Sequence, residues 1–124
     1  MATTPFSSIR SVTVPVTDLD RSKALFLGLG CSEVFDTELQ PGFRWIELAL
    51  PGGGAGLSLV ATVEGQPVGI DTGIRLETID ARAAREAVQS AGLEADELLD
   101  WDTAPLMFSF VDPDGNRFYV LEAG

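Results

Sequence analysis

Histidine is absent from this chain of 124 residues, and cysteine and tyrosine occur once each. The lack of histidine removes the commonest metal ligand and the commonest general base. The lone Cys31 cannot form an intrachain disulfide, so the fold does not depend on an oxidising compartment. No apolar run approaches the length of a membrane span, and the first residues lack the pattern of a secretory signal. We therefore expect a cytoplasmic protein without membrane contact.

Basic residues are also scarce. Eight Lys and Arg residues face nineteen Asp and Glu residues, which gives a formal net charge of −11. Such a surface repels phosphate backbones, and no basic patch offsets it, so the sequence argues against nucleic-acid binding. The same field attracts cationic ligands, although acidity alone is also a common means of staying soluble.

The composition is that of a folded domain. Hydrophobic residues make up 45% of the chain and charged residues 22%, unlike a disordered segment. This length supports one domain with its own core and is too short for two ordinary domains. We expect a single domain over residues 1–124.

Each half of the chain is predicted to contain a strand, a helix and three further strands. In the first half the predicted strands are 9–16, 33–37, 43–50 and 56–62, and a helix begins at Thr17 or Asp18 and ends near Gly28 or Gly30. In the second half the strands are 73–78, 93–97, 106–111 and 117–122, and a helix begins at Asp80 and stops at Gly92. Residues 64–71 form the natural linker. This repetition of order indicates an internal duplication.

A tight turn followed by a strand is predicted near the end, in Asp112-Pro-Asp-Gly-Asn116 and residues 117–122. Pro113 presets the backbone for the second turn position, and Gly115 or Asn116 can adopt the left-handed conformation. Alternation along the strand then places Arg117, Tyr119 and Leu121 on one face and Phe118 and Val120 on the other.

Several short motifs occur in order along about residues 8–122: Val16-Thr-Asp-Leu-Asp-Arg-Ser-Lys23, Leu29-Gly30, Arg44-Trp45, Pro51-Gly-Gly-Gly54, Ile79-Asp-Ala81 and Asp112-Pro-Asp-Gly-Asn116. With the order of elements, they resemble the vicinal oxygen chelate superfamily, which includes glyoxalase I, bleomycin-resistance proteins, fosfomycin-resistance enzymes and extradiol dioxygenases. The resemblance implies an α+β fold of two tandem βαβββ modules, over about 8–63 and 72–122. It also implies cup-shaped mixed sheets with helices on their outer faces, and a homodimer with pockets built from the cups.

In the metal-dependent members, strands one and four of each module supply the ligands of a divalent ion. Carried over to this sequence, these positions fall on Ser11, Ser58, Gly73 and Tyr119, with Thr72 and Asp71 as offsets for the third. Hydroxyls and a neutral phenol make a poor site for such an ion. We therefore expect no metal and no cofactor. An oxygen-only site built from Glu47, Asp71 and Glu77 stays open as an alternative, although its spacing matches no metal motif.

Alternating strand positions predict which side chains line the cup. The candidate ligand-binding residues are Ser11, Thr13, Trp45, Glu47, Ser58, Arg75, Glu77, Trp101, Phe108 and Tyr119. They combine aromatic and polar groups, as small-molecule sites do. Several of them also have a simpler structural interpretation. Phe108 and Trp45 can be core, Glu47 and Glu77 can lie on solvated strand faces, and Arg75 can pair with one of these carboxylates.

The leading hypothesis is a metal-independent small-molecule-binding protein of the glyoxalase and bleomycin-resistance type, which sequesters a cationic or aromatic drug or metabolite. The alternative is a metal-independent isomerase, lyase or cyclase. In that enzyme Glu77, Arg75 and Tyr119 would be the catalytic residues, using acid–base chemistry on a small metabolite. A residual metal-dependent lyase or dioxygenase is the third hypothesis.

Overall fold

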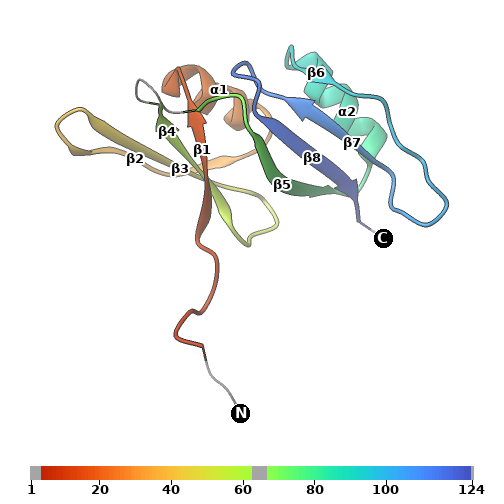
Figure 1. Cartoon of the computed structure of the whole chain (residues 1–124), viewed down its shortest axis with the longest axis horizontal. Coiled ribbons are helices and arrows are strands. Elements are labelled where there is room, and N and C mark those ends of the chain that lie inside the picture. Colours follow the sequence, from red (N-terminus) through yellow and green to blue (C-terminus); the bar gives the residue numbers. More distant parts are fainter. Residues whose placement is uncertain (1–3, 63–66, 124) are drawn as a thin grey trace.

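Each half of the chain folds into a four-stranded sheet with one helix against it (Figure 1). The computed structural model describes residues 4–62 and 67–123. Within these ranges the order of a strand, a helix and three strands occurs twice. This confirms the predicted α+β fold of two tandem βαβββ modules with mixed sheets.

The two modules share one topology. Module one comprises β1 (Ser11–Val16), α1 (Leu19–Gly28), β2 (Ser32–Gln40), β3 (Phe43–Ala49) and β4 (Gly56–Ala61), with the sheet order β1-β4-β3-β2. Module two comprises β5 (Asp71–Thr78), α2 (Ala81–Ser90), β6 (Glu94–Ala95), β7 (Met107–Val111) and β8 (Arg117–Glu122), with the order β5-β8-β7-β6. In each sheet the first strand is parallel to the last, and the other neighbours are antiparallel.

Two strands, β2 and β6, differ in length from the prediction by more than two residues. β2 continues to Gln40 because it pairs with β3 in a long hairpin, which turns at Gly42 with a φ of 81°. The added residues are exposed and mostly polar, so no apolar alternation marks them in the sequence. β6 covers two residues only, after which the chain leaves the sheet as a loop. Residues 64–66 of the predicted linker lie outside the described ranges.

Aspartates begin both helices. The carboxylate of Asp18 accepts a hydrogen bond from the backbone N of Arg21 at 3.0 Å, and that of Asp80 accepts one from Ala83 N at 3.1 Å. Each bond satisfies one of the amide groups that a helix leaves unpaired at its start. Asp18, rather than Thr17, is therefore the cap of α1. Neither helix is long and apolar enough to span a membrane, within the residues that the structure describes.

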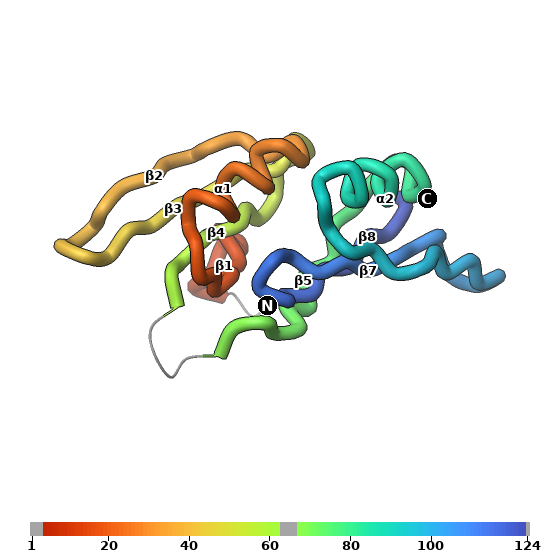
Figure 2. The backbone as a smooth tube through the Cα atoms, turned by 90° about the horizontal axis from the view of Figure 1, so that it is seen from above, coloured from red at the N-terminus to blue at the C-terminus, as the bar shows by residue number. Residues whose placement is uncertain are grey.

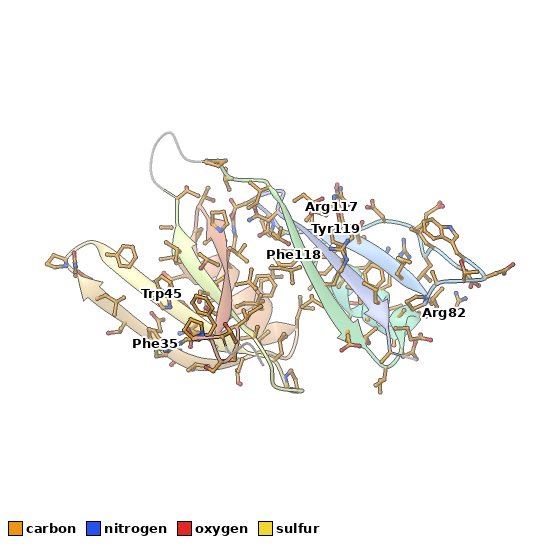
Figure 3. The ribbon with its side chains drawn as sticks, turned by 60° about the horizontal axis from the view of Figure 1, so that its bottom comes forward. Phe35, Trp45, Arg82, Arg117, Phe118 and Tyr119 are labelled. Atoms are coloured by element: carbon orange, nitrogen blue, oxygen red, sulfur yellow. The ribbon has the colours of Figure 1, made fainter. Side chains whose placement is uncertain are left out.

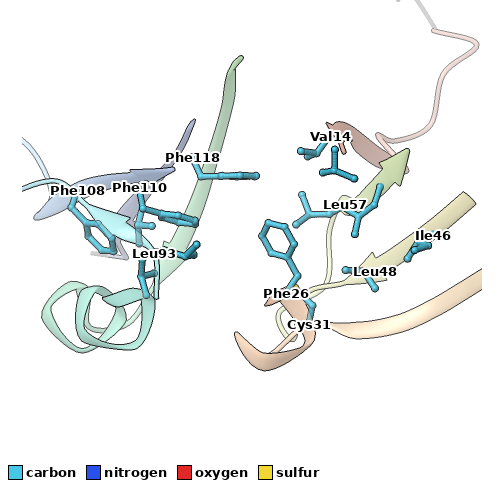
Figure 4. Close-up of a cluster of buried hydrophobic side chains, with 14 residues drawn as sticks. Val14, Phe26, Cys31, Ile46, Leu48, Leu57, Leu93, Phe108, Phe110 and Phe118 are labelled. Atoms are coloured by element: carbon cyan, nitrogen blue, oxygen red, sulfur yellow. The ribbon is translucent and has the colours of Figure 1, made fainter. Parts of the chain in front are cut away.

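The helix-facing sides of both sheets meet in one hydrophobic core (Figure 4). The ring of Phe26 from α1 packs edge-on against Phe118 of β8, with centroids 5.5 Å apart, and Phe110 of β7 stacks on Phe118 at 5.3 Å. Both helices lie on the same side of the molecule (Figure 2). Because side chains alternate along a strand, the other, concave face of each sheet points away from this shared core.

The predicted turn at residues 112–116 joins the two modules. Gly115 takes the left-handed conformation with a φ of 84°, while Asn116 is fully buried. The side-chain oxygen of Asn116 accepts hydrogen bonds from Gly69 N and Ile70 N at 3.1 and 3.0 Å. Its amide nitrogen donates to Pro15 O of β1 at 2.8 Å and to Asp112 at 3.0 Å. One side chain thus connects β1, the segment before β5 and the turn itself.

A second side chain of the same turn contacts the start of α1. The carboxylate of Asp114 accepts hydrogen bonds from the backbone N of Thr17 at 3.1 Å and from its hydroxyl at 2.5 Å. It also pairs with Arg21 of α1 at 3.4 Å. The turn is therefore a structural joint as well as the beginning of β8.

Candidate functional site

The concave face of module one has a polar centre. The hydroxyl of the buried Ser58 on β4 donates a hydrogen bond to Ser11 Oγ on β1 at 2.7 Å. In the strand registers, Ser58 lies opposite Thr13 on one side and Glu47 of β3 on the other. The structure thus brings together four residues that the sequence analysis assigned to a ligand site.

Glu47 is a charged residue that is only 6% exposed. Arg10, which lies just before β1, forms a forked pair with it. Arg10 Nε donates to both carboxylate oxygens at 3.1 and 3.3 Å, and Nη2 donates to Oε2 at 3.2 Å. A buried carboxylate is costly unless it is paired and hydrogen-bonded, and the Arg10 guanidinium supplies both interactions for Glu47.

Aromatic side chains surround this polar centre. Trp45 lies two residues before Glu47 on the same face of β3, and its ring centroid is 6.2 Å from that of Phe43. Phe35 lies opposite Glu47 on β2, in the same module as Trp45 (Figure 3). The concave face of module one therefore offers a carboxylate between aromatic rings.

The concave face of module two is centred on Tyr119 of β8 (Figure 3). Its hydroxyl donates to Asp71 Oδ2 at 2.5 Å, and the guanidinium of Arg75 lies 4.7 Å from its ring centroid. Arg75 Nη1 is held by Gly73 O at 2.8 Å. The bond between Tyr119 and Asp71 is the main cause that lowers the pKa of the Asp71 carboxyl and raises that of the Tyr119 phenol. At neutral pH Tyr119 is a donor and Asp71 an ionised acceptor.

Asp96 is a further charged group of module two, and it bonds residues next to Tyr119. Ser109 lies opposite Tyr119 in the β7–β8 register, and its hydroxyl donates to Asp96 Oδ2 at 2.6 Å. Arg117 Nη1 donates to Asp96 at 2.5 Å and to Ser109 at 2.8 Å. The bonds from Ser109 and then Arg117 lower the pKa of Asp96. Sequence reasoning missed Asp96 and Ser109, although alternation along 106–111 places Ser109 on the face opposite Phe108.

The four positions at which related proteins hold a metal do not fit a divalent ion here. Ser11 and Ser58 bond each other, Tyr119 bonds Asp71, and Gly73 has no side chain. The first pair lies on the sheet of module one and the second on the sheet of module two. In the described part of the chain, no three His, Cys, Asp or Glu residues group closely enough to hold a metal ion. The alternative set of Glu47, Asp71 and Glu77 is also divided between the modules.

The remaining candidates lie in three different places: on β5, in the core and in a loop. Glu77 and Arg75 are exposed on the concave face of β5, where Arg75 lies opposite Tyr119, so the three proposed catalytic residues share one face. The prediction that Phe108 binds the ligand is corrected by the structure. Its side chain is 2% exposed and points from β7 into the shared core, so it lines no ligand site. Trp101 is 58% exposed in the loop between β6 and β7.

Comparisons with known proteins identify relatives of the whole chain. Residues 8–120 match the family model described as Glyoxalase/Bleomycin resistance protein/Dioxygenase superfamily. No curated protein matches the chain. A solved structure of a member of this superfamily from Sphaerobacter thermophilus DSM 20745 is 27% identical, with a TM-score of 0.87, and the alignment covers 95% of this chain and 98% of that one.

Two further solved structures are similar. TnmS3, an antibiotic binding protein from Streptomyces sp. CB03234, is 25% identical, with a TM-score of 0.85 and coverage of 98% and 100% of the two chains. The fosfomycin resistance protein FosX from Listeria monocytogenes shares the fold at 14% identity, with a TM-score of 0.76 and coverage of 96% and 95%. The family match over residues 8–120 and the repeated βαβββ topology together show that this chain belongs to the glyoxalase, bleomycin-resistance and dioxygenase superfamily, the vicinal oxygen chelate proteins.

Proposed function

We propose that this protein binds a small organic molecule on its concave faces without a metal ion, and that it sequesters a drug or metabolite. The observation that carries this proposal is the chemistry of the four inherited metal positions. The side chains of Ser11, Ser58 and Tyr119 form hydrogen bonds with other side chains, and Gly73 has no side chain that could bind a metal. Around them, the faces keep the combination of aromatic walls and placed polar groups that is typical of small-molecule sites.

We further infer that the site is completed by a second copy of the chain. In one chain both concave faces are open, and β5 exposes Arg75 and Glu77 to solvent. In a homodimer, module one of each copy faces module two of its partner, so that Trp45 and Tyr119 come to opposite walls of one pocket. The printed description of TnmS3 as an antibiotic binding protein supports a binding role on this scaffold. A sedimentation measurement that gives a monomer at micromolar concentration contradicts this arrangement.

The ligand proposal is tested by a thermal-shift screen of aromatic and cationic natural products, followed by calorimetry on the hits. We expect saturable binding that Trp45→Ala weakens and that Arg82→Gln, at an exposed position on α2, leaves unchanged. Metal content is measured in protein purified without chelators, and added Zn, Ni, Mn or Fe should not change ligand affinity. The absence of saturable binding across the screen argues against the function, and stoichiometric metal argues against its metal independence.

A metal-independent enzyme is the second candidate, because Tyr119 bonds Asp71, the Arg75 guanidinium lies over the Tyr119 ring, and Glu77 is exposed on the same face of β5. Here Glu77 is the base that removes a proton, and Arg75 and Tyr119 stabilise the negative charge that develops. This candidate requires that Glu77→Gln abolishes turnover of a bound metabolite and keeps its affinity. A parallel loss of binding and turnover excludes the proton-transfer role.

A further inference from the structure

An ion pair between Arg10 and Glu47 lies on the concave face of module one. Glu47 projects from the middle of β3, between Phe35 on the neighbouring strand and Trp45 on its own. Carboxylates pair strongly with forked cations, and aromatic faces attract cations further. The guanidinium that now occupies this place comes from the chain itself.

Arg10 is held in a way that lets its side chain leave. Its backbone O accepts a hydrogen bond from Gly56 N at 3.0 Å, which fixes the main chain at the start of β1. The side chain is 75% exposed, and within the described ranges it donates hydrogen bonds to Glu47 alone. The segment before it extends from the body of the molecule into solvent (Figure 1). Rotation of the side chain therefore returns the guanidinium to water, whereas Glu47 cannot follow.

We propose that Glu47 is the anchor for a cationic group of the ligand, an amidinium, guanidinium or ammonium attached to an aromatic ring, and that Arg10 occupies this anchor until the ligand displaces it. The inference rests on the proposed binding function and adds the ligand's charge and its point of attachment. The ligand's cation takes over the forked pairing with Glu47, and its ring packs beside Trp45 and Phe35. Arg10 is thus an internal competitor.

The experiment compares probes of equal shape and different charge. Benzamidine and 2-naphthamidine are titrated against their uncharged amides, benzamide and 2-naphthamide. Binding is followed by calorimetry and by tryptophan fluorescence. The chain has two tryptophans, so all variants carry Trp101→Phe and the fluorescence comes from Trp45 alone. The variants are Arg10→Gln and Glu47→Gln. Arg82→Gln is the matched control, because Arg82 is an exposed arginine on α2 of module two (Figure 3).

We expect the amidines to bind more tightly than the amides. Removal of the competitor in Arg10→Gln should raise amidine affinity roughly five- to tenfold, the scale of the net contribution of one hydrogen bond. Glu47→Gln should lower amidine affinity at least about tenfold and bring it to that of the amides. Arg82→Gln should change neither. Because Arg10→Gln leaves a buried carboxylate unpaired, its melting temperature should rise more on addition of amidine than that of the wild type.

The sign of the Arg10→Gln effect decides the inference. If Arg10 only supports the structure, this folded variant binds amidines as the wild type does or more weakly, and the anchor is overturned. The anchor is also overturned if no amidine binds the wild type or Arg10→Gln while other compounds of the ligand screen do bind. Failure of every compound in that screen overturns the binding function itself. Arg10→Gln keeps the test decisive even if Glu47→Gln does not fold.

Discussion

Replacement of Asn116 by alanine removes the four hydrogen bonds that this side chain makes in the joint between the modules. The change leaves Gly69 N, Ile70 N, Pro15 O and Asp112 Oδ2 without this partner. A buried donor or acceptor left unpaired costs about 1–3 kcal/mol. Water reaches the exposed Gly69, and the Asp112 carboxylate keeps its bonds from the backbone N of Asp114 and of Asn116. We therefore count Ile70 N and Pro15 O and expect a loss of roughly 2–6 kcal/mol in the free energy of unfolding. That is a large part of the roughly 5–15 kcal/mol that holds a domain folded.

The loss is measured by urea denaturation at pH 7, followed by circular dichroism. Gln89→Ala is the matched control, because it removes an exposed side-chain amide from α2 and should stay within about 0.5 kcal/mol of the wild type. Asn116→Asp separates the donor from the acceptor role. It keeps the oxygen that Gly69 and Ile70 need and replaces the amide nitrogen, 3.0 Å from a carboxylate oxygen of Asp112, by a second negative oxygen.

The repulsion between these carboxylates raises the pKa of the introduced group in the folded state, so Asn116→Asp should regain stability as the pH falls toward 5. Asn116→Ala should show no such recovery. A loss below about 1 kcal/mol in Asn116→Ala, at an unchanged dependence on urea, would show that the joint holds through other contacts and that our count is wrong.

Three further predictions concern single side chains. Hydrogen bonds from Arg44 and then Lys23 hold the pKa of Asp36 well below its usual range. The ionised Asp36 therefore stabilises the fold above about pH 4, and this contribution decreases as the pH falls further. Asp36→Asn should therefore cost about 1–3 kcal/mol at pH 7 and flatten stability between pH 4 and pH 2, as urea titrations over this range will reveal. Tyr119→Phe should raise the pKa of Asp71 toward its usual value, and an NMR titration of that carboxyl that shows no rise contradicts the assigned bond. Phe26→Ala should cost about 3–5 kcal/mol and lower the melting temperature, because it empties the boundary between the modules; a change below about 1 kcal/mol speaks against a shared core.

Local patterns were sufficient to predict most of the fold. Alternation in residues 117–122 placed Tyr119 on one face and Phe118 on the other, and this is the observed arrangement. The turn residues at 112–116 predicted the reversal before β8, although the sequence left Gly115 and Asn116 as equal candidates for the left-handed position. Only the structure shows that Gly115 adopts the left-handed conformation and that the Asn116 side chain bonds Pro15 of β1.

The site was predicted less completely, because its pairs come from distant segments. Glu47 was identified from its strand, but nothing near it in sequence indicates Arg10, which is 37 residues away. Asp96 reaches the concave face from a loop, and loops carry no periodicity that shows where a side chain points. Phe108 was included among the aromatic candidates although its strand position places it in the core. The period of two identifies the two faces of a strand, but not which of them is buried.

The joint at Asn116 also bears on the order in which the chain can fold during synthesis. Its bond to Pro15 spans 101 residues, and the bond of Asp114 to Thr17 spans 97. Contacts of such long sequence separation form late, because the loop between them must close first. Module one leaves the ribosome complete while the partners of Phe26 and Pro15 are still unmade. Until residues 112–118 emerge, the nascent chain exposes an apolar ring and an edge strand, so its last segment determines when its first strand is protected from aggregation.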